Sequence, residues 1–162
     1  MLQGFAPLAD SHSRVLILGS MPSVQSLAKG QYYGNGQNAF WRIVYTLWGD
    51  VPDAAYSRRC AFLLAHGIAL WDTLAGCERS GSLDSAIKKP QVNDFGAFFT
   101  DYPAIRQVFF NGQAAARLFL RQGGEKLLGG RPYQVLPSTS PAYTLPYAAK
   151  LAAWQAVKTA AA

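Results

Sequence analysis

Four short apolar runs, each bounded by glycine, proline or polar residues, constrain the fold of this chain more than any other feature. Runs of this length and apolar content are typical of strands buried on both faces of a sheet. Segments with apolar residues at helical spacing lie between them. Strands that alternate with helices predict an α/β fold, here a three-layer α/β/α sandwich around a central, mainly parallel four-stranded sheet. The expected strands are residues 14–20, 67–72, 106–112 and 132–138.

The segments between and after these strands predict helices. One of them is expected to begin with Asp53 as its N-cap and to stop at Gly67. The expected helices are residues 39–48, 53–67, 112–124 and 144–160. Because the 162 residues contain no repeat and no linker-like stretch, we expect a single domain over residues 1–162.

The chain lacks the residues that several classes of protein need. No apolar run approaches the roughly 20 residues of a membrane-spanning helix, and residues 1–14 lack the pattern of a signal peptide. Cys60 and Cys77 are not at a metal-ligand or redox spacing, and the chain has only 2 histidines, so no metal site is expected. We therefore expect a reduced, cytoplasmic protein without a metal ion or a membrane segment.

The charge of the chain favours a polyanionic partner. Lys and Arg number 15 against 9 Asp and Glu, which gives a net charge of +6. A basic surface attracts nucleic acid, although many basic proteins bind no anionic partner. The charge alone therefore leaves nucleic acid as one candidate partner.

The carboxyl ends of the four expected strands all carry polar or small residues. Open α/β sheets bind their ligands at this edge. The first strand runs into "GSMPS" (19–23), the second ends at Asp72, and the third ends at Asn111. The fourth ends in "LPSTSPAY" (136–143). Loops are commonly polar, so one such end says little, but four together predict one assembled pocket.

Several chemistries lack their signatures. No G-x-G-x-x-G follows a strand and no glycine-rich loop ends in Gly-Lys-Ser/Thr, so no nucleotide cofactor is expected. His12 precedes the first strand and His66 lies at the opposite end of the sheet from the pocket, so neither is placed as the base of a serine triad. Asp72 is the only acid clearly at a strand end, while Glu78 and Asp84 fall in the following loop, so no catalytic carboxylate pair is expected.

Three motifs carry a family resemblance: "VLILGSMPS" (15–23), "QYYGNGQNAFW" (31–41) and "LPSTSPAY" (136–143). They resemble the uracil-DNA glycosylase superfamily, and most of all its sixth family, the hypoxanthine-DNA (deoxyinosine) glycosylases. Residues 67–88 and 108–119 resemble the same family, so the resemblance covers most of the chain. It implies a monomeric, cofactor-free repair enzyme that flips a deaminated base, hypoxanthine first, out of double-stranded DNA and excises it hydrolytically.

Two positions depart from the superfamily pattern. Relatives usually carry Asp or Asn as the third residue of the first motif, where it orients the attacking water, and Met21 stands there in this chain. Relatives usually begin the last motif with His or Asn, which stabilises the departing base, and here Leu136 stands there. Both departures fit the hypoxanthine family and argue against a uracil or mismatch glycosylase. The missing acid also supports another alternative, a non-catalytic binder of damaged or single-stranded nucleic acid.

The resemblance assigns catalysis to an asparagine of the 31–41 stretch. Asn38 matches the family motif best, and Asn35 is the fallback. A simpler interpretation is that Asn38 only caps the helix expected to start at Ala39.

A pocket for a flipped base needs an aromatic face and groups that read base edges. Amides both donate and accept, which suits a lactam such as hypoxanthine. The candidate faces are Tyr32, Tyr33 and Phe40, with Tyr33 the better stacking candidate, and the candidate amides are Asn35, Asn38 and Asn111. Trp41 is expected in the core.

The remaining site residues follow from the strand ends and motifs. By resemblance, Asp72 occupies the strand end where relatives place a base-reading amide, although it could instead cap the next turn. Asn111 could likewise be only a turn residue before Gly112. Gly19, Ser20 and Met21 complete the expected substrate-binding set.

The last motif is expected to contact DNA and not to perform chemistry. The resemblance makes it the loop that presses on the minor groove and phosphates, and its prolines would keep it rigid enough to compress DNA. The alternative is a cap for the C-terminal helix. The expected DNA-contacting residues are Pro22, Ser23, Pro137, Ser138, Thr139 and Ser140.

Overall fold

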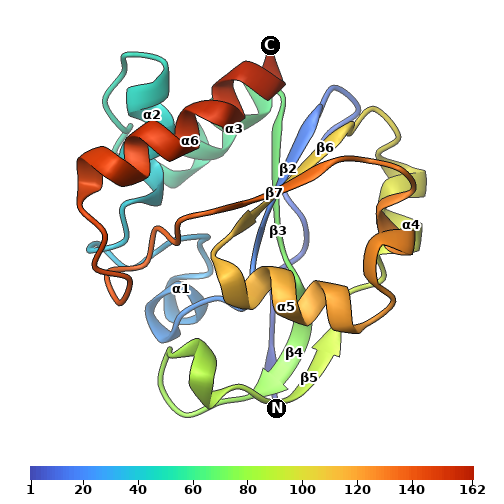
Figure 1. The fold of residues 1–162 in the computed structure, drawn as a ribbon. Helices are drawn as coiled ribbons and strands as arrows, with labels where there is room; N and C mark the ends of the chain where they lie inside the picture. The colour runs from blue at the N-terminus through green and yellow to red at the C-terminus, as the bar shows by residue number, and fades with distance from the viewer.

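The computed structural model describes residues 1–162 and has a four-stranded sheet at its centre, with strand order β3-β2-β6-β7 (Figure 1). All its pairings are parallel, which confirms the predicted sheet. The strands are β2 (Val15–Gly19), β3 (Ile68–Asp72), β6 (Gln107–Asn111) and β7 (Tyr133–Leu136). Gly19 pairs with Asp72 and Asn111 with Leu136, so the register brings the carboxyl ends of the strands to one edge.

Helices cover both faces of this sheet, which confirms the predicted three-layer sandwich. In Figure 1, α2, α3 and α6 lie on one side and α4 and α5 on the other. Alternate residues of β2 face the two layers: Val15 and Ile17 pack with the first set, Leu16 and Leu18 with the second. The helices are α1 (Val24–Lys29), α2 (Phe40–Leu47), α3 (Tyr56–Ala65), α4 (Phe95–Asp101), α5 (Gln113–Arg121) and α6 (Tyr147–Ala161). None of them has the length and apolar character required to cross a bilayer.

A second, antiparallel sheet with the order β1-β4-β5 was not predicted. Its strands are β1 (Leu2–Gln3), β4 (Leu74–Glu78) and β5 (Lys88–Val92). β4 starts two residues after β3 ends, and β5 is almost entirely exposed. The sequence therefore shows neither an apolar run nor a clean alternation. Helices α1 and α4 and the short 3₁₀ helices η1 (Asp84–Ala86) and η2 (Gly124–Leu128) were also not predicted.

The predicted start of α3 was wrong. The helix begins at Tyr56, with Ala55 as an N-cap that makes no side-chain bond. Asp53 instead accepts a 2.8 Å hydrogen bond from the Tyr45 hydroxyl, because a tertiary partner competes with the local cap. Gly67 does follow the end of the helix, with a φ of 74°, as a helix-terminating glycine should.

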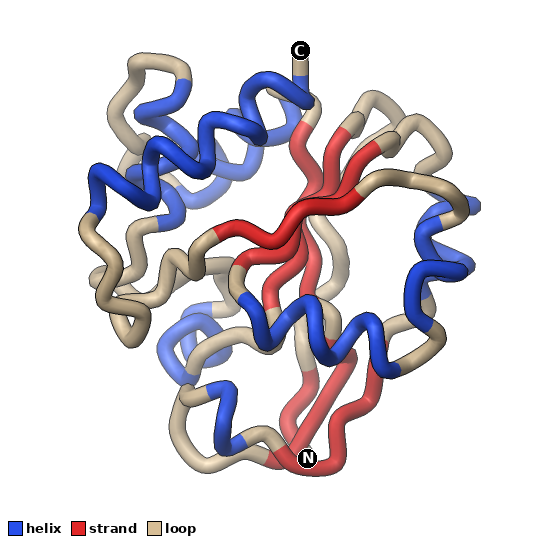
Figure 2. Tube along the Cα trace, viewed as in Figure 1, coloured by secondary structure: helices blue, strands red, loops and turns tan.

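Two loops meet beside the carboxyl edge of the sheet. The loop that leads into α2 and the loop that follows β7 lie side by side in Figure 2. The Ala39 N–H donates to the Thr139 carbonyl oxygen at 3.0 Å, which fastens one loop to the other. Two of the three motifs are thus adjacent in space although about one hundred residues of chain separate them.

Candidate functional site

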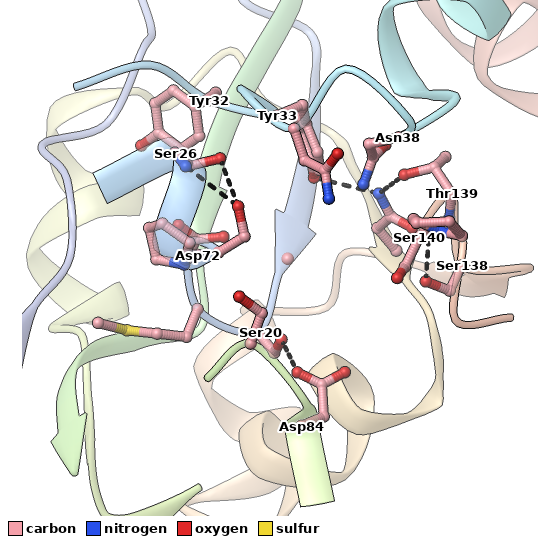
Figure 3. A pocket seen from close by; sticks show the side chains of 18 residues that line it. Ser20, Ser26, Tyr32, Tyr33, Asn38, Asp72, Asp84, Ser138, Thr139 and Ser140 are labelled. Atoms are coloured by element: carbon pink, nitrogen blue, oxygen red, sulfur yellow. Dashed lines mark hydrogen bonds between the residues drawn. The ribbon is translucent and has the colours of Figure 1, made fainter. Parts of the chain in front are cut away.

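A pocket opens at this edge, where the four strand ends predicted a site (Figure 3). The β4–β5 connection also contributes to its wall. The expected site residues that line it are Gly19, Ser20, Met21, Pro22, Ser23, Tyr33, Asn35, Asn38, Asp72, Asn111, Ser138, Thr139 and Ser140. Tyr32, one of the three candidate aromatic faces, lines it as well. The lining residues that the sequence did not indicate are Ser26, Ser82, Asp84 and Pro141. Phe40 and Pro137 do not line it.

The aromatic wall of the pocket is Tyr33 and not Phe40. Phe40 is 0% exposed and lies in the core, so its predicted contact with a substrate is not favoured by this structure. Its ring stacks on Tyr33 with centroids 3.9 Å apart and planes inclined by 15°. Phe40 therefore supports Tyr33, and only Tyr33 of this pair is presented to the pocket. The prediction that Trp41 is a core residue is confirmed, since it is 8% exposed.

Tyr33 is held in an unusual backbone conformation. Its φ is 54°, in the left-handed region that bulky residues rarely adopt. The phenol oxygen accepts a 3.1 Å hydrogen bond from Asn111 Nδ2. Burial is the main cause that raises the pKa of Tyr33, followed by the charge of Asp72, so the phenol stays neutral. Such a strained conformation persists where the surrounding structure fixes it, as at functional sites.

Asn38 combines a structural contact with a free amide group. Its Oδ1 accepts a 2.9 Å hydrogen bond from the Phe40 N–H at the start of α2. Because a backbone N–H can only donate, this contact fixes the amide with Oδ1 toward the helix. Nδ2 makes no hydrogen bond within the chain, and the side chain lines the pocket. The capping interpretation and the functional one are therefore compatible.

Asn35 is arranged similarly, although closer to its own turn. Its Oδ1 accepts a 2.9 Å hydrogen bond from the Gln37 N–H, and its carbonyl oxygen accepts from the Asn38 N–H. Asn35 thus shapes the segment that presents Asn38 to the pocket, while it also lines the pocket itself.

Asn111 connects the aromatic wall to the last motif. One amide hydrogen goes to the Tyr33 hydroxyl and the other to Thr139 Oγ1 at 3.0 Å. Its Oδ1 accepts from the Thr139 N–H at 2.9 Å. Both amide hydrogens are engaged inside the chain, so the structure shows Asn111 as a residue that positions its neighbours. Its role as a direct reader of the base stays a prediction that this geometry does not favour.

Thr139 anchors the last motif, so its predicted contact with DNA stays a prediction that its burial and bonding do not favour. It is 1% exposed, and its N–H, hydroxyl and carbonyl oxygen are all bonded to other segments. Ser138 and Ser140 on either side are half-buried and face the pocket. Pro137 lies outside the pocket, where its carbonyl oxygen accepts from Trp154 Nε1 at 2.9 Å.

A buried lysine holds the far end of the same loop. Lys150 is 4% exposed, and its Nζ donates to the carbonyl oxygens of Ser140 at 3.1 Å and Tyr143 at 2.8 Å. Its burial lowers its pKa. Together with Thr139, it makes the loop rigid, which the two prolines alone suggested from the sequence.

The first motif supplies walls but no acid. Met21 is 7% exposed and packs with Leu74 and Cys77, so it offers only an apolar surface. Leu136 of the last motif is 2% exposed and belongs to the core. Neither position therefore offers a polar side chain to the pocket.

The β4–β5 connection closes the pocket from below in Figure 3. Ser20 Oγ donates to Asp84 Oδ1 at 2.5 Å, and the Val24 N–H donates to Ser82 Oγ at 2.9 Å. Arg79 reaches across to the Pro22 carbonyl oxygen at 2.6 Å. No sequence pattern could indicate this wall, because it depends on the unpredicted second sheet.

Asp72 is the buried acid of the pocket. It is 5% exposed, and its Oδ2 has no hydrogen-bond partner, so it does not cap a turn. Figure 3 places Asp72 on one side of the pocket and Asn38 with Thr139 on the other, with Tyr33 between them. No three His, Cys, Asp or Glu side chains are grouped as a metal site would require. The pocket offers an aromatic wall, a free amide and one buried carboxyl.

Known proteins resemble this chain in sequence and in fold. Residues 6–159 match the family model described as the uracil DNA glycosylase superfamily. A protein from Methanosarcina acetivorans named hypoxanthine DNA glycosylase is 39% identical over 141 residues, or 85% of each chain. A protein of the same name from Methanosarcina barkeri is 38% identical over 112 residues, or 68% of this chain and 71% of that one. A solution NMR structure from M. acetivorans, named as a candidate uracil DNA glycosylase, is 36% identical, with a TM-score of 0.83 over 98% of this chain and 97% of that one.

Proposed function

Because the chain belongs to the uracil-DNA glycosylase superfamily, we propose that it releases hypoxanthine from deoxyinosine in DNA and leaves an abasic site. It is an enzyme, a DNA glycosylase that hydrolyses the bond between a base and its deoxyribose. The two relatives named hypoxanthine DNA glycosylase support hypoxanthine as the base. The observation that carries the proposal is the free amide of Asn38 beside the Tyr33 wall, in a pocket whose first motif supplies no acid.

The pocket suits a base that has left the helix. An enzyme that acts on a base in a duplex must turn it out of the stack, and the Tyr33 ring supplies a face against which the base can pack. Stacking of a base on an aromatic side chain contributes about 1–3 kcal/mol. The stack on Phe40 and the bond from Asn111 hold that face in position before the base arrives.

Asn38 then acts at the scissile bond. As the bond from C1′ to the base breaks, its electron pair stays with the base and the sugar becomes oxocarbenium-like. Water adds to C1′ and releases a proton to solvent, and the departing base anion takes up a proton, which completes the hydrolysis. The Nδ2 donors of Asn38 are oriented in advance by the Phe40 contact, so they can orient the water or the scissile nucleotide. Preorganised donors of this kind are an efficient means of stabilising developing charge.

The protein acts on DNA, and we propose that it acts as a monomer on the double-stranded form. Ser138 and Ser140 lie on a rigid loop at the pocket mouth, where hydroxyl groups can contact phosphates. Electrostatic attraction from the net charge of +6 would add to these contacts.

Affinity for an inosine duplex should therefore depend on salt. Each neutralised phosphate releases counterions, so even a few contacts should weaken binding by at least about tenfold between about 50 and about 200 mM salt. Fluorescence anisotropy with a labelled duplex measures this. An affinity that does not change over this range would contradict phosphate-dominated binding.

A panel of matched duplexes tests the substrate. Duplexes that differ only in carrying inosine, uracil or xanthosine are incubated with enzyme in excess, and abasic sites are revealed by alkaline cleavage. The proposal expects the inosine duplex to be cut fastest. Faster cleavage of the uracil duplex would replace hypoxanthine with uracil, the substrate in the name given to the solved relative.

A further inference from the structure

The carboxyl group of Asp72 stands out in the pocket because it makes no hydrogen bond within the chain. It is 5% exposed and lines the pocket, yet its Oδ2 is buried without a hydrogen-bond partner. Buried polar atoms are nearly always paired, and leaving one unpaired destabilises a protein. Gly19 leaves space for this carboxyl, since a Cβ there would lie 2.5 Å from Oδ1. The packing thus accommodates a carboxyl oxygen that no residue of the chain satisfies and that faces a pocket open to a ligand.

No nearby cation pairs with this carboxyl. Burial is the largest cause that raises the pKa of Asp72, to about 7, and the negative charge of Asp84 adds to it. Arg79 acts in the opposite direction, but its side chain bonds to backbone carbonyl oxygens. Tyr32 and Tyr33 also face Asp72, and the pKa of each is raised, chiefly by burial, so both remain neutral. The surroundings therefore favour the protonated acid.

We propose that Asp72 takes part as a neutral carboxylic acid whose O–H donates a hydrogen bond to the flipped base. This inference rests on the proposed glycosylase function. A neutral carboxyl presents one donor and one acceptor in a plane, as an amide does, and so matches the donor and acceptor of a lactam edge. A carboxylate only accepts, and could not supply the donor.

The same proton assists bond cleavage. When the bond to the sugar breaks, the electron pair remains on the base, which becomes negatively charged. An ionised Asp72 would repel this charge, whereas the neutral acid donates a hydrogen bond that strengthens as the charge grows. The acid keeps its proton throughout, so no proton transfer from Asp72 is required.

The proposal sets the sign of the pH dependence. Asp72 is protonated below its pKa of about 7 and ionised above it. If only the protonated form is active, the single-turnover rate should be constant at low pH and fall about tenfold per pH unit above that pKa. The experiment measures cleavage of an inosine duplex with saturating wild-type enzyme from about pH 5.5 to about pH 9.

Three variants identify the group responsible. Asp72→Asn keeps a donor that does not titrate, so it should retain cleavage and lose the decline centred near pH 7. Asp72→Ala should cleave about 10²-fold more slowly at low pH. Asp84→Asn removes a charge that raises the pKa of Asp72, so it should move the decline to lower pH without abolishing it. If the fall in rate at high pH came from ionisation of the base and not of Asp72, the Asp72→Asn variant would show the same fall.

Melting curves without DNA give a second reading of the protonation state. A carboxyl whose pKa is raised on folding loses its proton more readily in the unfolded chain. Rising pH therefore favours the unfolded chain, and the free energy of unfolding of the wild type should fall as pH rises toward 7. The gain in Tm from Asp72→Asn should therefore be larger at pH 8 than at pH 5.

Two outcomes would overturn the proposal. If Asp72→Asn is folded but as inactive as Asp72→Ala at every pH, the carboxylate is required and the acid acts as a base. If the wild-type rate rises with pH through 7, the ionised form is the active one. If wild-type enzyme releases no hypoxanthine at any pH, the proposed function itself fails, and this result is distinct from both.

Discussion

Asn38→Asp should leave α2 intact and reduce single-turnover cleavage of an inosine duplex by about 10²-fold or more, the size expected when a preorganised donor is lost. Aspartate can accept the Phe40 N–H as Asn38 Oδ1 does, and it caps helices as well as asparagine. It replaces the free Nδ2 donors with an oxygen that only accepts. Its charge would also oppose the negative charge that develops on the base.

Asn38→Ala separates the two roles further. It removes the cap, which costs about 1 kcal/mol of folding free energy, and it removes the donors, so cleavage should fall at least as far as in Asn38→Asp. Gln37→Ala is the matched control, because Gln37 is exposed in the same turn and does not line the pocket. Near-normal cleavage by a well-folded Asn38→Ala would falsify the role of Asn38 and assign it to Asn35.

Gly19→Ala should reduce cleavage strongly although it adds only one methyl group to the pocket wall. A Cβ at Gly19 would lie 2.5 Å from Asp72 Oδ1, so the Asp72 carboxyl must move. Misplacement of reacting groups by about 1 Å can cost about 10²-fold in rate, and overpacking costs about 1–3 kcal/mol of stability. We expect reduced cleavage in a protein that still folds.

Gly36→Ala is the control for this variant. Nothing lies within 4 Å of a Cβ built at Gly36, and this residue does not have a positive φ. Its cleavage rate and Tm should match those of the wild type. Wild-type cleavage by Gly19→Ala would show that the Asp72 carboxyl can move without consequence, which contradicts a precise role for it.

The central sheet could be predicted from the sequence because its strands are buried on both faces. Residues 15–18 of β2 are each 0% exposed, and such strands appear as apolar runs without alternation. The β1-β4-β5 sheet could not be predicted, because β5 carries Lys88, Lys89 and Pro90 and is exposed nearly throughout. Its register follows from contacts with the rest of the fold.

The motifs located the pocket but did not determine what each side chain does there. Asn38 and Asp72 lie where the strand ends and the resemblance indicated. The engagement of Asn111 with Tyr33 and Thr139 depends on three segments meeting in space, and no local pattern encodes it. Phe40 and Trp41 are adjacent in the sequence, and both are buried. The Tyr33 ring covers Phe40, and it does so from a backbone conformation with a positive φ that the sequence does not reveal.

The release of free base from an inosine duplex tests the central claim most directly. Saturating wild-type enzyme is incubated with the duplex at about pH 6, where Asp72 is expected to be protonated. Free hypoxanthine is measured by mass spectrometry and abasic sites by alkaline cleavage of the same sample. The account predicts that both appear together in equal amounts. Tight binding of the duplex with neither product would contradict it and would identify the chain as a non-catalytic binder of damaged DNA.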